Sequence, residues 1–262
     1  MKLPIERAVR VDGLLWKVIA TRGRHGGPTL VMLPGTLGTA AIFREPIERL
    51  GGSVRMVSLT YPLIDDIERL ADSLAALMDK LAIPHASVVG SSLGGFLAQH
   101  FAARHPQRVD KLILGNTLCD PGLTRRIVQR QPVEELRAAP ATRHRDMVLA
   151  SVRSWPETEP AVTQLKALLI DSGTRLLSPR AMKARVLAVQ AAPAAPALAI
   201  AGARITIIDC EDDPLLPRAV QDDVVRRYPG ARHVRLKTGG HYPYIVRPDA
   251  YCAVLERALG ID

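Results

Sequence analysis

The chain has 262 residues, of which 47% are hydrophobic and 23% are charged, so it has the size and composition of one folded domain and not of a disordered protein. Its formal charge of +9 raises the question of nucleic-acid binding. The basic residues form only short groups without interleaved aromatic residues, such as Arg143-His144-Arg145, and we therefore expect solvated helix faces and no nucleic-acid partner.

The predicted elements begin with antiparallel strands. Residues 5–11 and 14–21 flank Asp12-Gly13, a dipeptide that favours a type I′ turn, and together they predict a β-hairpin. A short apolar run over residues 29–33 predicts a buried strand. Helical spacing of apolar residues follows over residues 40–50.

Beyond this point, strands and helices alternate. The strands are rich in Val, Ile and Leu without alternating polarity, which is typical of a parallel sheet covered by helices on both faces. Strands are predicted over 54–59, 86–89, 111–114, 204–209 and 233–236, and helices over 64–81, 93–104, 218–228 and 248–259. With the hairpin and the strand at 29–33, the sequence predicts an α/β fold with a mostly parallel eight-stranded sheet.

Residues 119–203 interrupt this alternation. They contain no convincing strand, only helical segments near 124–137, 143–154, 159–171 and 179–190. Since ligands bind outside the carboxyl ends of parallel strands, we expect this insertion to form a helical lid over a site, with residues 1–118 and 204–262 forming the core. The insertion has 12 Lys and Arg against 7 Asp and Glu, so 12 − 7 = 5 of the nine net charges lie in it.

The segment Gly90-Ser91-Ser92-Leu93-Gly94 matches the pattern G-x-S-x-G between a predicted strand and a predicted helix. A serine at the centre of such a sharp turn needs small residues two positions to either side, so that the backbone bends and the hydroxyl stays exposed. We therefore predict that Ser92 is a nucleophile. Ser91 lies on the same turn but off the centre of the motif.

A nucleophilic serine needs a base and an acid that orients the base. His241 follows the last predicted strand, and the order Ser, acid, His is expected for this arrangement. The strand at 204–209 runs into Cys210-Glu211-Asp212-Asp213, where Asp213 is the favoured acid and Asp212 the alternative.

An acyl-transfer site also needs hydrogen-bond donors for the negative oxygen that forms in the reaction. We expect one to be the backbone amide of Leu93, at the start of the helix after Ser92. The second is expected from the loop at 33–38, where Thr36 is the best candidate.

No stretch approaches the roughly 18 apolar residues of a membrane span, and residues 1–7 lack an apolar segment, so a cytoplasmic location is expected. Cys119, Cys210 and Cys252 have no metal-binding spacing and are too few for a disulfide framework. We therefore expect neither a metal nor another cofactor.

Four blocks together resemble the maspardin branch of the α/β-hydrolase superfamily: Leu33-Pro34-Gly35-Thr36, Tyr61-Pro62, Ser92 to Gln99 and Leu236 to Gly240. The resemblance covers about residues 29–120 and 204–251. Maspardins are regarded as non-catalytic partner-binding proteins that lack a histidine matching His241 and an acid matching Asp213. This chain has both residues, which favours a relative with a complete Ser-Asp-His triad.

The predicted function is hydrolysis of a carboxylic ester in a small-molecule acyl substrate. Thioester hydrolysis and acyl transfer to an acceptor other than water would use the same residues. If the basic insertion faces the site, an acyl group bearing a carboxylate would be favoured. The alternative from another class is a non-catalytic, maspardin-like partner-binding protein.

Overall fold

Residues 3–261, which the computed structural model describes, contain an eight-stranded sheet, and this confirms the predicted fold class. The strand order is β1-β2-β4-β3-β5-β6-β7-β8, with β2 antiparallel to both β1 and β4 and all other neighbours parallel. The bounds are β1 (Arg7–Val11), β2 (Leu14–Ala20), β3 (Thr29–Leu33), β4 (Arg55–Thr60), β5 (Ala86–Ser91), β6 (Val109–Gly115), β7 (Ile205–Cys210) and β8 (Arg232–Leu236). In the turn of the hairpin, Asp12 has φ 49° and Gly13 has φ 78°, as a type I′ turn requires.

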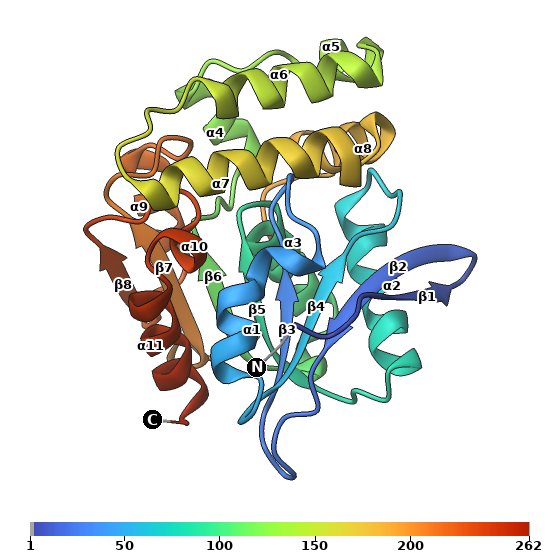
Figure 1. Ribbon diagram of the computed structural model, residues 1–262, viewed down its shortest axis with the longest axis vertical. Helices are drawn as coiled ribbons and strands as arrows, with labels where there is room; N and C mark the ends of the chain where they lie inside the picture. Colours follow the sequence, from blue (N-terminus) through green and yellow to red (C-terminus); the bar gives the residue numbers. More distant parts are fainter. Residues whose placement is uncertain (1–2, 262) are drawn as a thin grey trace.

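Helices cover both faces of the sheet (Figure 1). Successive side chains of a strand point to opposite faces, so each strand contributes to two apolar clusters. In β3, Val31 and Leu33 belong to one cluster, while Leu30 and Met32 belong to the other. The first cluster includes α2 (Ile67–Lys80), α3 (Leu93–Arg104) and α9 (Arg218–Arg227), and the second includes α1 (Arg44–Leu50), α10 (Pro243–Val246) and α11 (Pro248–Leu259).

The chain between β6 and β7 is helical. Its elements, called the cap helices below, lie over the carboxyl ends of the parallel strands, at the top of Figure 1. They are α4 (Pro121–Ile127), α5 (Val133–Ala138), α6 (Ala141–Arg153), α7 (Pro160–Asp171) and α8 (Pro179–Gln190), with a π-helical turn (Ser172–Leu176) after α7. The cap helices therefore cover the edge of the sheet at which Ser92 follows β5.

The predicted single helix over 124–137 is wrong, because α4 and α5 are separated by residues 128–132. Pro132 has no backbone N–H to donate and disfavours helical backbone in the residue before it. Gln129 adopts φ 50°, which also interrupts a helix. The prediction over 40–50 was also too simple, since a 3₁₀ turn (Ala40–Phe43) precedes α1, and α10 was not predicted at all.

Cys119, Cys210 and Cys252 are free and buried. Nowhere between residues 3 and 261 do three or more His, Cys, Asp or Glu side chains gather as a metal ion would require. Over the same residues, no helix combines the length and the apolar character needed to cross a bilayer.

Candidate active site

Ser92 occupies the turn between β5 and α3 in an unusual backbone conformation, with φ 55° and ψ −119°. Non-glycine residues rarely adopt such angles, and the strain costs about 1–3 kcal/mol. The neighbouring glycines are required by crowding: a Cβ on Gly90 would lie 2.1 Å from the oxygen of Gly94, and a Cβ on Gly94 would lie 1.9 Å from the oxygen of Leu33. The G-x-S-x-G pattern is therefore explained by the packing of this turn.

Hydrogen bonds from the end of β6 hold the strained turn. The Ser92 N–H donates to the oxygen of Gly115 at 3.0 Å, and Thr117 Oγ1 donates to the oxygen of Ser92 at 2.7 Å. Ser92 Oγ itself has no hydrogen-bond partner among residues 3–261 and lies at the wall of a cavity. The backbone of Ser92 is thus fixed while its hydroxyl stays free to react.

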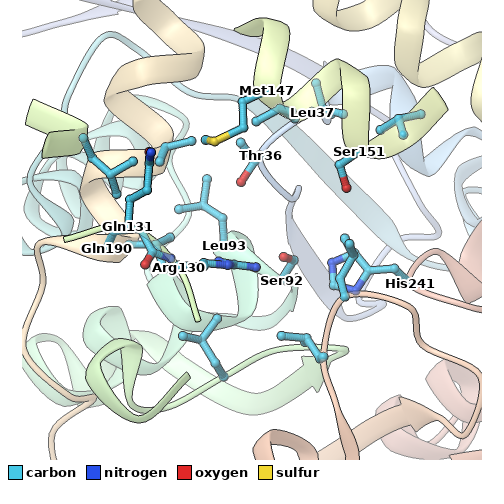
Figure 2. A pocket seen from close by; sticks show the side chains of 18 of the residues that line it. Thr36, Leu37, Ser92, Leu93, Arg130, Gln131, Met147, Ser151, Gln190 and His241 are labelled. Carbon is cyan, nitrogen blue, oxygen red and sulfur yellow. The ribbon is translucent and has the colours of Figure 1, made fainter. Parts of the chain in front are cut away.

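His241 and Asp213 meet beside this cavity. Asp213 follows β7 and His241 follows the adjacent strand β8, and His241 Nδ1 lies 2.8 Å from Asp213 Oδ2 and 3.1 Å from Oδ1. The Asp213 side chain is fully buried. Because Asp213 occupies Nδ1, the other ring nitrogen is the one available to the cavity, where Figure 2 shows His241 facing Ser92.

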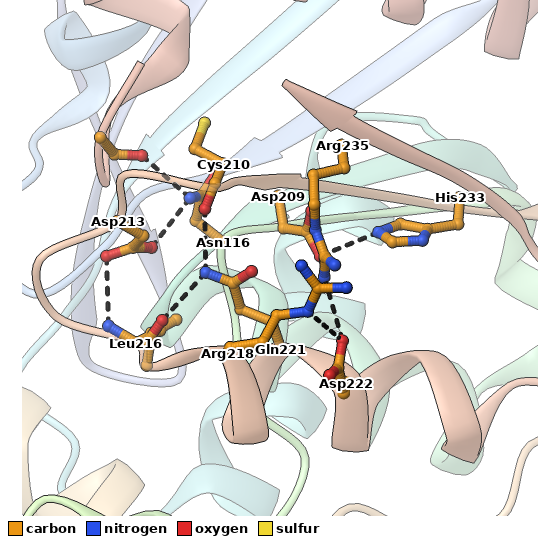
Figure 3. A network of polar contacts seen from close by, with 11 residues as sticks. Asn116, Asp209, Cys210, Asp213, Leu216, Arg218, Gln221, Asp222, His233 and Arg235 are labelled. Carbon is orange, nitrogen blue, oxygen red and sulfur yellow. Dashed lines mark hydrogen bonds and ion pairs between the residues drawn. The ribbon is translucent and has the colours of Figure 1, made fainter. Parts of the chain in front are cut away.

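Three further donors hold the Asp213 carboxylate, and Figure 3 labels the residues of two of them, Asn116 and Leu216. Asn116 Nδ2 donates to Oδ2 at 2.8 Å, and the backbone amides of Leu215 and Leu216 donate to Oδ1 at 2.8 and 3.2 Å. Burial alone raises the pKa of Asp213, but His241, Asn116 and the Leu215 amide more than offset this effect, so the pKa lies below its usual value. The carboxylate is therefore ionised at neutral pH.

Asp212, the alternative acid, has a different role in the structure. Its carboxylate accepts hydrogen bonds from the backbone amides of Gly239 at 3.2 Å and Gly240 at 2.9 Å, and so it ties down the loop that carries His241. Asp209 pairs instead with two basic side chains of β8 (Figure 3). Among the described residues, the carboxylate that contacts the His241 ring is that of Asp213.

Thr36 and Leu93, the two expected oxyanion donors, both line the cavity beside Ser92. Leu93 is the first residue of α3, so its N–H has no acceptor within the helix. The Thr36 N–H likewise donates no hydrogen bond within residues 3–261. The loop is close to the serine, since a Cβ on Gly35 would lie 3.3 Å from Ser92 Cβ, and Thr36, Leu93, Ser92 and His241 all line one cavity.

Arg185, a residue that the sequence analysis did not single out, holds the Thr36 loop from the side of the cap helices. Arg185 of α8 donates through Nη1 to the oxygens of Thr36 at 3.0 Å and Gly38 at 2.7 Å, and its guanidinium lies 5.1 Å from the ring centroid of Tyr61. It is only 1% exposed and pairs with no carboxylate in the described part of the chain. Burial lowers the pKa of Arg185 to about 10. In the sequence, nothing distinguishes this arginine from the exposed ones.

The cavity under the cap helices has a volume of about 410 Å³, within the range of small-molecule sites. Most of its wall is apolar, and its polar groups are the side chains around Ser92 and a separate set contributed by the cap helices and their loops. The apolar lining is Leu37, Leu93, Leu118, Leu136, Met147, Val148, Val152, Trp155, Val186, Val189, Leu215, Leu216 and Tyr242, and the polar cap residues are Gln129, Arg130, Gln131, Ser151 and Gln190.

Comparisons with known proteins agree with this fold. The general model of the alpha/beta hydrolase fold matches residues 28–248. The chain therefore belongs to the α/β-hydrolase family. Within it, the chain is 30% identical to maspardin of Mus musculus over 239 residues, which are 90% of this chain and 76% of that protein, and this confirms the predicted maspardin-like branch.

Two further proteins similar to this chain are named for different activities. Pimeloyl-(acyl-carrier protein) methyl ester esterase of Aeromonas hydrophila is 26% identical over 263 residues, covering 89% of this chain and 96% of that protein. The crystal structure of the enol-lactonase from Burkholderia xenovorans LB400 superposes with a TM-score of 0.78 at 22% identity, covering 97% of this chain and all of that one. The second likeness shows the shared fold.

Proposed function

We propose that the protein is a serine hydrolase that acts on carboxylic esters. The observation that carries this proposal is the buried Asp213 carboxylate hydrogen-bonded to His241, with the free hydroxyl of Ser92 facing the same ring across an apolar cavity. A serine, a histidine and an ionised carboxylate in this order are the groups that acyl transfer requires.

In the proposed reaction, Ser92 Oγ attacks the ester carbonyl carbon while its proton passes to His241 Nε2. Asp213 keeps the other ring proton on Nδ1 and stabilises the imidazolium that forms. The amides of Thr36 and Leu93 bind the oxyanion, and the loss of a single side-chain donor from such a site typically costs about 2.7–4 kcal/mol. The bond to the alcohol breaks, and the alkoxide takes the proton from His241. Water then hydrolyses the acyl-serine by the same route in reverse.

Two alternatives use the same fold. An acceptor other than water would make the protein an acyltransferase, and a thioester substrate would make it a thioesterase, both with the same residues. The likeness to maspardin favours a different alternative, a non-catalytic partner-binding protein. The pairing of Asp213 with His241 supports the enzyme, because partner binding requires no buried carboxylate beneath a histidine that faces a serine.

A fluorophosphonate probe tests the proposal, since it forms a covalent bond only with an activated serine. We expect labelling of the wild type and of Ser91→Ala, and no labelling of Ser92→Ala. Hydrolysis of short-chain methyl esters then separates an esterase from an acyltransferase that needs another acceptor. A folded wild-type sample that resists the probe would favour the partner-binding alternative.

Arg185→Met is expected to lower kcat about 10–100-fold while leaving KM nearly unchanged. The arginine donates its hydrogen bonds to the carbonyl side of the Thr36 loop and does not line the cavity, so its loss shifts the oxyanion donor and not the substrate pocket. A misplacement of about 1 Å costs up to about 100-fold in rate. Steady-state kinetics with a neutral ester measure both constants.

The control for this prediction is Arg180→Met, which removes an exposed arginine from the same helix. Arg185→Lys should recover part of kcat, because an ammonium group can still donate to a loop carbonyl. A rise in KM with kcat unchanged would show that Arg185 supports the substrate pocket and does not position the oxyanion loop.

A further inference from the structure

Arg130 lies in the break between α4 and α5 and reaches into the cavity. The residue belongs to an exposed loop, but Figure 2 shows its guanidinium inside the cavity and directed toward Ser92. The loop is tied back to α4, because the Arg130 N–H donates to the oxygen of Arg125 at 3.1 Å. With Gln129 at φ 50°, the backbone turns so that residues 129–131 all line the cavity.

This guanidinium has no acidic partner. The residues that line the cavity include no Asp and no Glu, and Arg130 forms no ion pair within residues 3–261. Desolvation lowers the pKa of Arg130, and no nearby carboxylate raises it again. A guanidinium that reaches an apolar cavity and has no acidic partner there is available to a ligand that supplies the opposite charge.

A second buried polar group lies at the same end of the cavity. Gln190, at the end of α8, is only 4% exposed, lines the cavity and has a side-chain oxygen without a hydrogen-bond partner in the described structure. Figure 2 shows Gln190, Gln131 and Arg130 grouped together on one side of the cavity. The apolar wall and the Arg130 guanidinium thus offer complementary surfaces to a ligand with an aliphatic part and a negatively charged part, and the Gln190 oxygen can accept from a donor beside them.

We propose that the site selects esters that carry a carboxylate, and that Arg130 recognises this group while Ser92 attacks the ester carbonyl. The proposal rests on the proposed ester hydrolysis and names its substrate class. A guanidinium binds a carboxylate through two parallel hydrogen bonds, which gives both energy and orientation. The carboxylate belongs to the acid part of the ester or to its alcohol part, and the experiment below distinguishes the two.

Matched pairs of substrates that differ only in charge test the proposal. For the acid part, monomethyl succinate, glutarate and adipate are each compared with the methyl ester whose terminal group is a carboxamide. For the alcohol part, the pentanoyl ester of glycolic acid is compared with that of glycolamide. Proton release at constant pH gives kcat/KM for every ester without a chromogenic leaving group.

In one of the two sets, the wild type is expected to prefer the carboxylate over its carboxamide about tenfold or more, as a charge-assisted hydrogen bond would provide. Arg130→Gln should remove this preference, because it lowers kcat/KM for the carboxylate far more than for the carboxamide. Arg130→Lys should keep part of it. Arg126→Gln, which removes an exposed arginine of α4 that does not line the cavity, should keep all of it.

The proposal would be overturned if Arg130→Gln lowered kcat/KM equally for the carboxylate and the carboxamide of a pair. A wild-type preference for the carboxamide in both sets of substrates would also overturn it. A wild type that hydrolyses none of these esters, yet is labelled at Ser92 by the fluorophosphonate, would also overturn it and leave the proposed function standing. Absence of labelling at Ser92 would instead reject the proposed function itself.

Discussion

Replacing Ser92 with alanine is expected to lower kcat/KM for ester hydrolysis by about 10⁴-fold or more, which is the effect of losing the nucleophile in related triads. The hydroxyl is the only group removed, and it has no hydrogen-bond partner among residues 3–261. Stability should therefore change little, because alanine keeps the Cβ and has the same preference against φ 55°. Initial rates with a methyl ester and thermal unfolding of the same samples measure both effects.

Ser91→Ala is the matched control for Ser92→Ala. Ser91 is the neighbouring residue, at the end of β5, and is 2% exposed, so its removal perturbs the same turn without touching the surface of the cavity. Its kcat/KM should stay near that of the wild type. If Ser92→Ala hydrolysed the ester with the same kcat/KM as the wild type, the protein would be an esterase whose nucleophile is not Ser92.

Asp213→Asn is expected to reduce kcat about 10⁴-fold. The amide occupies the space of the carboxylate, but one end of it presents N–H groups to His241 Nδ1 and can hold the ring in the wrong tautomer. The imidazolium that forms in the reaction also loses its counter-charge. Since Asn116 Nδ2 already donates to this position at 2.8 Å, an asparagine at 213 would in addition place two donors face to face. Single-turnover acylation with an activated ester isolates the affected step.

Asp212→Asn is the control for this variant, and it decides between the two acids. Asp212 accepts from the amides of Gly239 and Gly240, and so its substitution should loosen the loop before His241 and reduce kcat far less than Asp213→Asn does. A greater loss in Asp212→Asn than in Asp213→Asn would show that Asp212 orients the histidine in the working enzyme.

Local patterns predicted the elements on which the site depends. The apolar runs at 29–33 and 86–89 became neighbouring strands β3 and β5, because runs without alternating polarity are stable only in a sheet covered on both faces. Helix α3 was predicted with the bounds that the structure has. The single helix predicted over 124–137 does not form, because the local effect of Pro132 outweighs the helical spacing on which the prediction relied. The resulting break carries Arg130 to the cavity.

The sequence by itself determined the α/β class, the strained turn at Ser92 and the candidates His241 and Asp213, because each depends on residue types at short spacings. Only the tertiary structure showed that Asp213 and not Asp212 contacts His241, since one residue of loop reverses the direction of a carboxylate. It also distinguished Arg185 and Arg130 from the other arginines of the cap. Their surroundings come from segments far away in the chain, and no local pattern records whether an arginine is buried, as Arg185 is, or reaches a cavity, as Arg130 does.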